Sequence, residues 1–156
     1  MIKEKLAKFL QKAKKRTFAS RISISKRTKD GGKEYSYSEG EFVYKDKYFG
    51  SVVDTGQELV WHKNRLIWSM SYRGGMINNK ELTNKCFSFL KKCLRKVPLE
   101  FPVRGPKDYK EGELRYENNW KGNLENFVGE EKIFCKEEQI YFRNYLGGMG
   151  KLLSLS

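Results

Sequence analysis

Residues 72–76 read Tyr-Arg-Gly-Gly-Met, and residues 145–149 read Tyr-Leu-Gly-Gly-Met. The two stretches lie 73 residues apart, and the same offset aligns other residues upstream of them. These pairs are Gly56/Gly129, Glu58/Glu131, Trp61/Phe134 and Trp68/Tyr141. Further back the offset becomes 72, and the pairs are Glu41/Glu113, Tyr44/Tyr116 and Gly50/Gly122. Backbone geometry and packing restrict where glycines and aromatic residues can stand. Identical or similar residues at these aligned positions therefore predict an internal repeat.

A shared apolar pattern precedes each half, at an offset of 80. Apolar residues recur there at i, i+4, i+7, i+8 and i+11, which is typical of one face of an amphipathic helix. They are Ile2, Leu6, Phe9, Leu10 and Ala13 in the first half, and Leu82, Cys86, Phe89, Leu90 and Cys93 in the second. We therefore expect two helices that bury these stripes and turn their lysines to solvent.

Strand-like segments follow each helix. Alternating apolar and polar residues predict strands at 41–48, 57–62 and 65–72, and again at 113–120, 130–135 and 139–145. Lys63-Asn64 fits a two-residue hairpin connection. The Gly-Gly pairs are expected to end the last strand of each half, because glycine accepts a positive φ. Residues 23–25 also alternate, and could add an edge strand.

The segments combine into an α+β fold. We predict a single domain over 1–156 made of two tandem α-β-β-β repeats, at about 1–77 and about 80–150. Residues 97–112 hold all three prolines and predict a stiff crossover between the repeats. Since no long flexible linker separates the halves, we expect one antiparallel sheet with pseudo-twofold symmetry, packed by the two helices.

Charge and cysteine content limit the class of protein. The net charge is +13, and residues 1–35 carry 12 Lys/Arg against 3 Asp/Glu. Such clusters can attract nucleic acid, anionic ligands or a membrane surface, although a lysine-rich face can also be simply solvated. The sequence shows no apolar run long enough to span a membrane and no signal peptide, so no membrane partner is expected. Three cysteines without a CxxC pair indicate reduced thiols in a cytoplasmic protein. We expect this protein to be bacterial or phage-like.

Motifs for catalysis or metal binding are absent. The sequence has no GxSxG, phosphate-binding loop, HExxH or zinc spacing, and we expect no catalytic residue, metal or cofactor. The single histidine, His62, ends a predicted strand and is interpreted as an ordinary polar residue of the surface. The paired glutamates, Glu58 and Glu131, could act as general acid and base, bind a cation, or accept backbone hydrogen bonds. An enzyme that uses this pair stays open as an alternative.

A ligand site between the two halves is the preferred hypothesis. Tyr141, Arg143 and Tyr145 share one strand face, and an aromatic–arginine–aromatic stripe suits a planar anionic or nucleotide-like ligand. Arg104, in the Arg-Gly-Pro turn, could point into the same cleft. The candidate ligand-binding residues are Glu58, Trp68, Tyr72, Arg104, Glu131, Tyr141, Arg143 and Tyr145. The function expected from them is that of a stand-alone, non-catalytic binding or sensor module, and a homodimer is compatible with it.

A basic nucleic-acid binder is the main alternative. Its phosphate contacts would come from Lys14, Lys15, Arg16, Arg21, Lys26 and Arg27. Contacts of this kind give salt-sensitive and sequence-tolerant binding. No helix-turn-helix, zinc-finger or RNA-recognition motif for base readout is present in the sequence.

The sequence also resembles a known family. GEFVYKDKYFG at 40–50, the Gly-Gln-Glu at 56–58 with the following Trp61, and the Arg-Gly-Pro turn at 104–106 are similar to the bacterial domain of unknown function 5680. The resemblance extends over about 8–149. Members of that family often follow a helix-turn-helix of the Cro/repressor type, which implies a sensor or effector domain attached to a DNA reader. No such reader occurs in this sequence, and the family carries no established activity.

Overall fold

Two helices form where the apolar stripes predict them. The structure, a computed structural model, describes residues 1–150. Helix α1 spans Ile2–Arg16, and helix α2 spans Thr83–Arg95 after a single 3-10 turn, η1, at Lys80–Leu82. The central stripe residues of both helices are buried, as predicted. The first position of each stripe is not, because Ile2 lies at the exposed end of α1 and Leu82 lies in η1.

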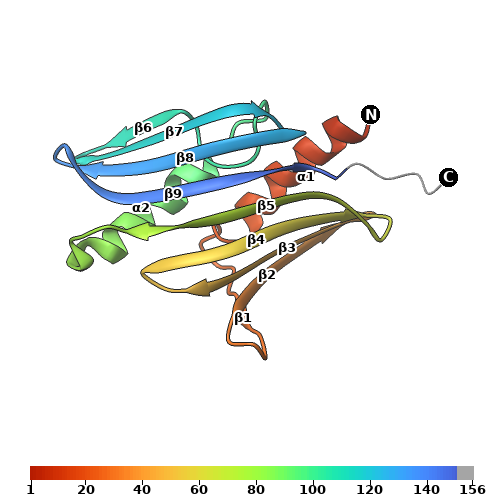
Figure 1. Cartoon of the computed structure of the whole chain (residues 1–156), viewed down its shortest axis with the longest axis horizontal. Helices are drawn as coiled ribbons and strands as arrows, with labels where there is room; N and C mark the ends of the chain where they lie inside the picture. Colours follow the sequence, from red (N-terminus) through yellow and green to blue (C-terminus); the bar gives the residue numbers. More distant parts are fainter. Residues whose placement is uncertain (151–156) are drawn as a thin grey trace.

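Nine strands in the described residues form one antiparallel sheet. They are β1 Lys26–Arg27, β2 Lys33–Glu39, β3 Phe42–Gly50, β4 Val53–His62, β5 Arg65–Met76, β6 Asp108–Glu111, β7 Leu114–Asn123, β8 Asn126–Cys135 and β9 Glu138–Met149. Their order across the sheet is β1-β2-β3-β4-β5-β9-β8-β7-β6. The two last strands of the halves, β5 and β9, therefore meet at the centre (Figure 1). The α+β class and the antiparallel sheet are confirmed.

Each half holds more strands than the three predicted. Strand β2 lies in a stretch where the sequence predicts no strand, and inward-facing Tyr35 is buried there between polar neighbours. Strand β6 lies at the end of the proline-containing crossover and pairs only with β7. An edge position suits a segment next to Pro106, since an edge strand tolerates missing hydrogen bonds. The edge strand expected at 23–25 is wrong, because β1 begins only at Lys26.

The Gly-Gly pairs do not end their strands. Gly74 and Gly75 lie inside the paired part of β5, and Gly147 and Gly148 lie inside β9. A Cβ on Gly74 would lie 2.6 Å from the Cα of Arg143 on the neighbouring strand. Gly75 has a φ of +147°, which side chains rarely adopt. The glycines therefore permit close strand approach within the sheet. The expectation that they terminate the ladder was wrong.

The hairpin at Lys63-Asn64 is confirmed. Strand β4 ends at His62 opposite Arg65, so only two residues connect β4 and β5. Both of these residues have a positive φ, of 51° and 62°. Lys136 and Glu137 connect β8 and β9 in the same way, with φ values of 49° and 69°. A two-residue connection with positive φ matches the twist of the flanking strands.

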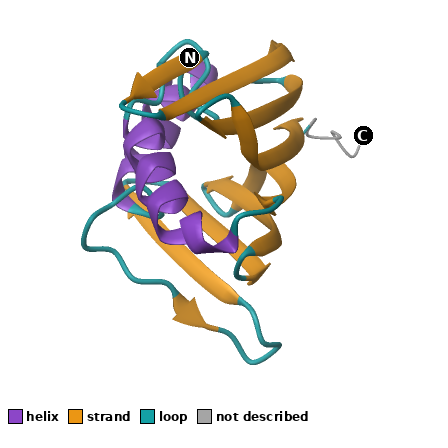
Figure 2. Ribbon diagram, turned by 90° about the vertical axis from the view of Figure 1, so that its left-hand side faces the viewer, coloured by secondary structure: helices purple, strands orange, loops and turns teal. Residues whose placement is uncertain are grey.

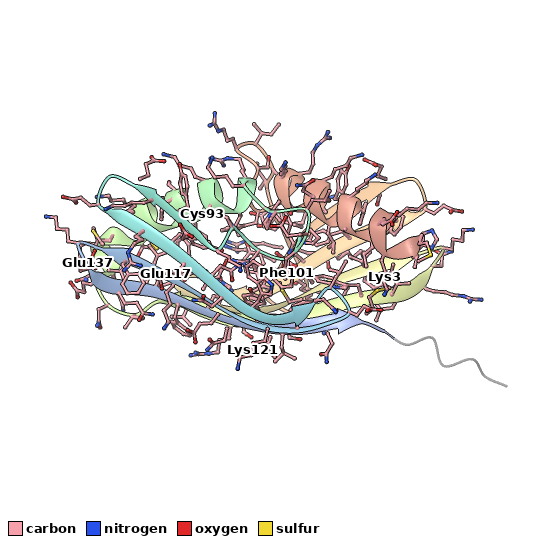
Figure 3. All side chains as sticks on the ribbon, turned by 90° about the horizontal axis from the view of Figure 1, so that it is seen from above. Lys3, Cys93, Phe101, Glu117, Lys121 and Glu137 are labelled. Atoms are coloured by element: carbon pink, nitrogen blue, oxygen red, sulfur yellow. The ribbon has the colours of Figure 1, made fainter. Side chains whose placement is uncertain are left out.

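The helices cover one face of the sheet and leave the other open (Figure 2). In Figure 3, Cys93 and Phe101 lie on the covered side, and Lys121 lies on the open side. The buried residues form two apolar clusters, one centred on α1 and one on α2. Each cluster takes residues from both halves: Phe127 and Tyr145 join the α1 cluster, while Met76 joins the α2 cluster. No helix in residues 1–150 has the length and apolar character needed to cross a bilayer.

Candidate functional site

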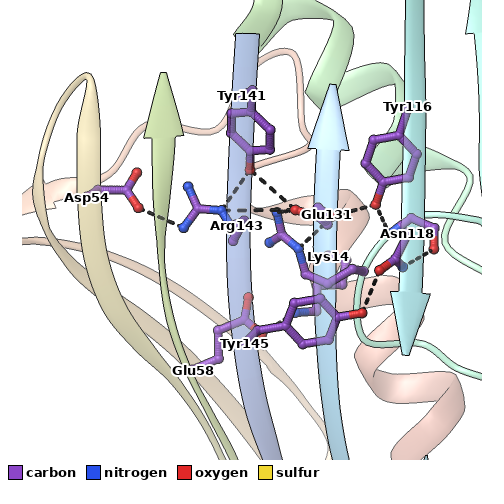
Figure 4. A network of polar contacts seen from close by, with 11 residues as sticks. Lys14, Asp54, Glu58, Tyr116, Asn118, Glu131, Tyr141, Arg143 and Tyr145 are labelled. Carbon is purple, nitrogen blue, oxygen red and sulfur yellow. Dashed lines mark hydrogen bonds and ion pairs between the residues drawn. The ribbon is translucent and has the colours of Figure 1, made fainter. Parts of the chain in front are cut away.

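The covered face of the sheet carries a buried polar network at its centre (Figure 4). Glu131 on β8 is fully buried and accepts a bidentate ion pair from Arg104, with N–O distances of 2.9 and 2.7 Å. Tyr116 on β7 and Tyr141 on β9 also donate hydrogen bonds to it. Burial alone would raise the pKa of Glu131. The charge and hydrogen bonds of Arg104 outweigh burial, and the pKa is lowered.

Arg143 on β9 joins the two halves. Its Nη1 lies 2.7 Å from Oδ1 of Asp54 on β4, and its Nε donates to the Tyr141 hydroxyl at 2.7 Å. The guanidinium also stands 4.8 Å from the ring centroid of Tyr72 on β5. Burial would lower the pKa of Arg143, but Tyr141 and Asp54 raise it. Arg143 is therefore a buried cation held mainly by contacts across the centre of the sheet.

Glu58 on β4 has a different cation. Lys14 comes from the last turn of α1, and its ammonium forms a buried ion pair with Glu58. The ammonium also lies 5.8 Å from the ring centroids of both Tyr44 and Trp68. Burial lowers the pKa of Lys14, and the charge of Glu58 opposes that shift. The indole nitrogen of Trp68 is buried without a hydrogen-bond partner in the described part of the chain.

Two tyrosines of the central strands make matching contacts. The Tyr72 hydroxyl donates to Oδ1 of Asp46 on β3 at 2.6 Å, and the Tyr145 hydroxyl donates to Oδ1 of Asn118 on β7 at 2.6 Å. Asn118 also donates to the Gly105 carbonyl at 2.9 Å, whereas Asp46 has no donor atom when ionised. Burial raises the pKa of Asp46 to about 7, and the charge of Glu58 acts in the same direction.

A cavity of about 40 Å³ lies between the helices and the sheet beside these residues. Its charged lining consists of Lys14, Asp46, Asp54, Glu58, Arg104 and Arg143. Thr17, Phe18 and Ala19 line it from the segment that follows α1. The cavity is therefore bounded by α1, α2 and the middle of the sheet, with polar groups from both halves facing it.

All eight residues of the predicted ligand site are buried on this face. Four of them line the cavity: Glu58, Tyr72, Arg104 and Arg143. The others, Trp68, Glu131, Tyr141 and Tyr145, lie within the adjoining network or core and do not line the cavity. Sequence reasoning missed Asp46 and Asp54 altogether. The offset of 72 that pairs Tyr44 with Tyr116 also pairs Asp46 with Asn118, and that pair was the available signal.

The basic residues of the alternative hypothesis separate into two groups. Lys15 and Arg16 are exposed at the end of α1, Arg21 is exposed on the segment between α1 and β1, and Lys26 and Arg27 are exposed and form β1 itself. Lys14 is only 5% exposed and is ion-paired with Glu58. The expectation that the helix lysines all face solvent is wrong for Lys14. The other five basic side chains of this hypothesis are accessible to the phosphate groups of a nucleic acid.

His62 and the cysteines lie apart from the network. The His62 imidazole stands 3.5 Å from the Glu41 carboxylate, with its ring against Phe42. The three thiols are free. Within residues 1–150, no three His, Cys, Asp or Glu side chains are placed to hold a metal ion.

Comparison with protein families places most of the chain in a known family. The family model described as Domain of unknown function (DUF5680) matches residues 46–149. The chain belongs to this family. The matched range includes every charged residue that lines the cavity of this DUF5680 protein except Lys14. No curated protein and no solved structure matches the chain.

Proposed function

We propose that this DUF5680 protein is a non-catalytic binding or sensor module whose small polar ligand occupies the cavity beneath the helices. The observation that carries the proposal is the charged lining of that cavity. Burying ionised groups is costly, and apolar side chains of similar volume often stabilise a core as well or better. A core that instead gathers three cations and three carboxylates around an open space is suited to polar recognition.

The size of the cavity favours a small ligand. About 40 Å³ exceeds the roughly 10–15 Å³ that one water needs, but it is far below the volume of a nucleotide site. A planar anionic or nucleotide-like ligand would require the segment with Thr17 and Phe18 to move outward. It would also have to compete with Asp54 for Arg143 and with Glu131 for Arg104. We therefore favour a small polar molecule, or the small end of a larger one.

A thermal-shift screen tests the proposal. Nucleotides, aromatic anions, amines and small metabolites are each added to the full chain, because a ligand of the native state must raise the melting temperature. A cavity ligand should stabilise the wild type and lose most of its effect in Tyr72→Phe, which removes one hydroxyl from the lining. The control is Ser71→Ala, the preceding and exposed residue of β5. Absence of stabilisation by every compound class would overturn the proposal.

We further propose that the two halves are repeats of one unit, related by a pseudo-twofold axis at the β5–β9 contact. The cross-strand register supports this, since Tyr72 lies opposite Tyr145, Trp68 opposite Met149 and Met76 opposite Tyr141. The offset of 73 aligns Tyr72 with Tyr145, so this pair corresponds to itself. It also aligns Trp68 with Tyr141 and Met76 with Met149, so the other two pairs correspond to each other. The free thiols support a reducing, cytoplasmic location.

Nucleic-acid binding remains a second candidate because five exposed basic residues follow one another from α1 to β1. They are Lys15, Arg16, Arg21, Lys26 and Arg27. Replacing all five with glutamine should abolish gel retardation of duplex or single strands at low salt. Lys14 is left in place because it is part of the buried network. Retardation that persists in the variant, or never occurs in the wild type, would remove this candidate.

A further inference from the structure

One carboxylate of the buried network has no cation within ion-pair distance in the described residues. Lys14 pairs with Glu58, Arg104 pairs with Glu131, and Arg143 pairs with Asp54. The remaining carboxylate is Asp46. Within residues 1–150 it forms no ion pair, and its carboxylate accepts a hydrogen bond only from the neutral hydroxyl of Tyr72. If all seven groups are ionised, the network therefore has an excess of one negative charge.

The unpaired carboxylate faces the cavity. Asp46 is 6% exposed and contributes to the lining of the 40 Å³ space. Its Oδ1 is occupied by the Tyr72 hydroxyl, so Oδ2 is free to accept a hydrogen bond. A buried charge without a partner is costly, and a cation in the adjoining space would offset that cost.

Lys14 shows which chemistry the surroundings accept. Its ammonium is held by one carboxylate and stands 5.8 Å from two aromatic rings. Tyr44, Tyr48 and Tyr72 line the cavity beside Asp46, so the same combination of carboxylate and aromatic rings is available there. An ammonium group needs only one anionic partner and is attracted to aromatic faces. A coordinated divalent metal would need more carboxylate or imidazole ligands than the described residues gather.

We propose that the cavity beside Asp46 binds a small monovalent cation of the ammonium class, either the ammonium ion or the primary amine of a small molecule. This inference rests on the proposed function, because it names a ligand class for the same cavity. A proton on Asp46 neutralises the same charge, so protonation and cation binding exclude each other. Binding is therefore expected to strengthen as the pH rises.

The second half provides a natural comparison. Asn118 occupies the position aligned with Asp46, and both side chains accept a tyrosine hydroxyl at 2.6 Å. An amide therefore fits this contact without carrying a charge. Asp46→Asn is accordingly a matched variant: it keeps the side-chain size and the Tyr72 hydrogen bond but removes the negative charge that would hold the cation.

The groups that share the cavity with Asp46 set the pH dependence. The charged ones are Lys14 from α1, Asp54 and Glu58 from β4, Arg104 from the crossover and Arg143 from β9. The tyrosines are Tyr44 and Tyr48 from β3 and Tyr72 from β5. Burial raises the pKa values of Tyr44 and Tyr72, so both stay neutral near physiological pH. The pKa of Asp46, raised to about 7, places the change of its charge near neutrality.

The test compares melting temperatures of the full chain in ammonium, methylammonium, sodium and tetramethylammonium chloride at equal ionic strength. At roughly pH 8.5 Asp46 is ionised, and ammonium should raise the melting temperature above that in sodium or tetramethylammonium. The increase should disappear at roughly pH 5.5, where a proton occupies the carboxylate. Methylammonium tests whether the site accepts the primary amine of a larger molecule. If it raises the melting temperature as much as ammonium does, the ligand is such an amine. If only ammonium raises the melting temperature, the ligand is the free ammonium ion.

A second measurement does not depend on a variant. In wild-type protein with ¹³C-labelled aspartate, ammonium should lower the apparent pKa of the Asp46 carboxyl, and sodium should not.

Asp46→Asn should abolish the ammonium-specific stabilisation if it folds. Equal melting temperatures in all four salts together with an unchanged Asp46 titration would overturn the cation site. If ammonium binds but the metabolite screen finds nothing larger, the cation site stands and the proposal of a ligand larger than ammonium fails.

Discussion

At the scale of single residues, two aligned and chemically identical side chains, Glu58 and Glu131, have different cationic partners. The aligned glutamates Glu58 and Glu131 are both buried, yet one is held by the point charge of Lys14 and the other by the planar fork of Arg104. Arginine matches a carboxylate with two parallel hydrogen bonds, and lysine does not. Arg104 therefore satisfies both carboxylate oxygens of Glu131, which does not line the cavity, whereas Glu58 and Lys14 do line it.

Removing the charge of Glu131 should destabilise the fold strongly. Glu131→Gln leaves Arg104 buried without its counter-ion, and breaking such a pair typically costs about 3–5 kcal/mol. Urea unfolding measures the loss. The matched control is Glu130→Gln on the same strand. Glu130 is exposed and pairs only with Lys132 within residues 1–150, so a change within about 0.5 kcal/mol is expected. Equal losses in both variants would contradict the buried pair.

Asp46 should make stability fall as the pH rises. Its pKa is about 7 in the folded protein, against an ordinary value of 3.8. Between these values the native state holds a proton that the unfolded state has lost, so the free energy of unfolding decreases with pH and levels off above 7. Asp46→Asn should remove this slope and be the more stable protein at alkaline pH, by an amount of the order of a few kcal/mol. Urea titrations across pH measure the difference, and parallel curves for the two proteins would refute the assignment.

At the scale of elements, the sequence predicts the parts with strong periodicity. Both helices, the Lys63-Asn64 hairpin and the six central strands occur near the expected positions. The sequence does not predict β2 or β6, because polar segments with serine, glycine or proline neighbours resemble loops. The Gly-Gly pairs were misread because close approach between strands depends on a partner strand far away in the sequence.

The site was predictable only in part, for a similar reason. The aligned glutamates and aromatic residues pointed to the centre of the sheet. They did not show which cationic side chain forms an ion pair with which glutamate. Lys14 lies next to buried Ala13 in a run of basic residues, and its partner Glu58 is 44 residues away. Helical periodicity places a residue on a face, and it does not show where a long flexible side chain ends.

Gly56 should be irreplaceable within β4. The Tyr72 ring lies over it, and a Cβ there would stand 2.6 Å from both the ring and the Lys47 carbonyl oxygen. Gly56→Ala must therefore shift a neighbouring backbone, and overpacking of this kind costs about 1–3 kcal/mol. The control is Gln57→Ala, the exposed next residue. Chemical denaturation should separate the two variants clearly, and a Gly56→Ala protein as stable as the wild type would disprove the close packing.

At the scale of the whole molecule, the two halves depend on each other. They share one sheet through β5 and β9, and each apolar cluster contains residues of both halves. A separate first half would expose the paired edge of β5 together with Trp68 and Tyr72. The protein should therefore unfold as one cooperative unit.

Hydrogen exchange should map this dependence. The backbone amides of β5 and β9 lie at the centre of nine strands, and should exchange slowest, at rates set by global unfolding. Those of β1 and β6, at the two edges, should exchange fastest. Mass spectrometry of peptic fragments gives the ranking. Faster exchange at β5 or β9 than in the outer strands β3 and β7 would mean that the halves separate before they unfold.

The two ends of the described chain lie at the same end of the molecule (Figure 1). Ile2, Met149 and Gly150 line one surface groove, and the Gly150 amide donates to the Ile67 carbonyl at 2.9 Å. Such proximity permits circular permutation. A chain that starts at Lys80, continues through β9, and passes by a short linker into α1 and on to β5 should adopt the same sheet, as judged by circular dichroism and its melting temperature. The order in which the ribosome makes the two halves would then have no consequence for the folded protein.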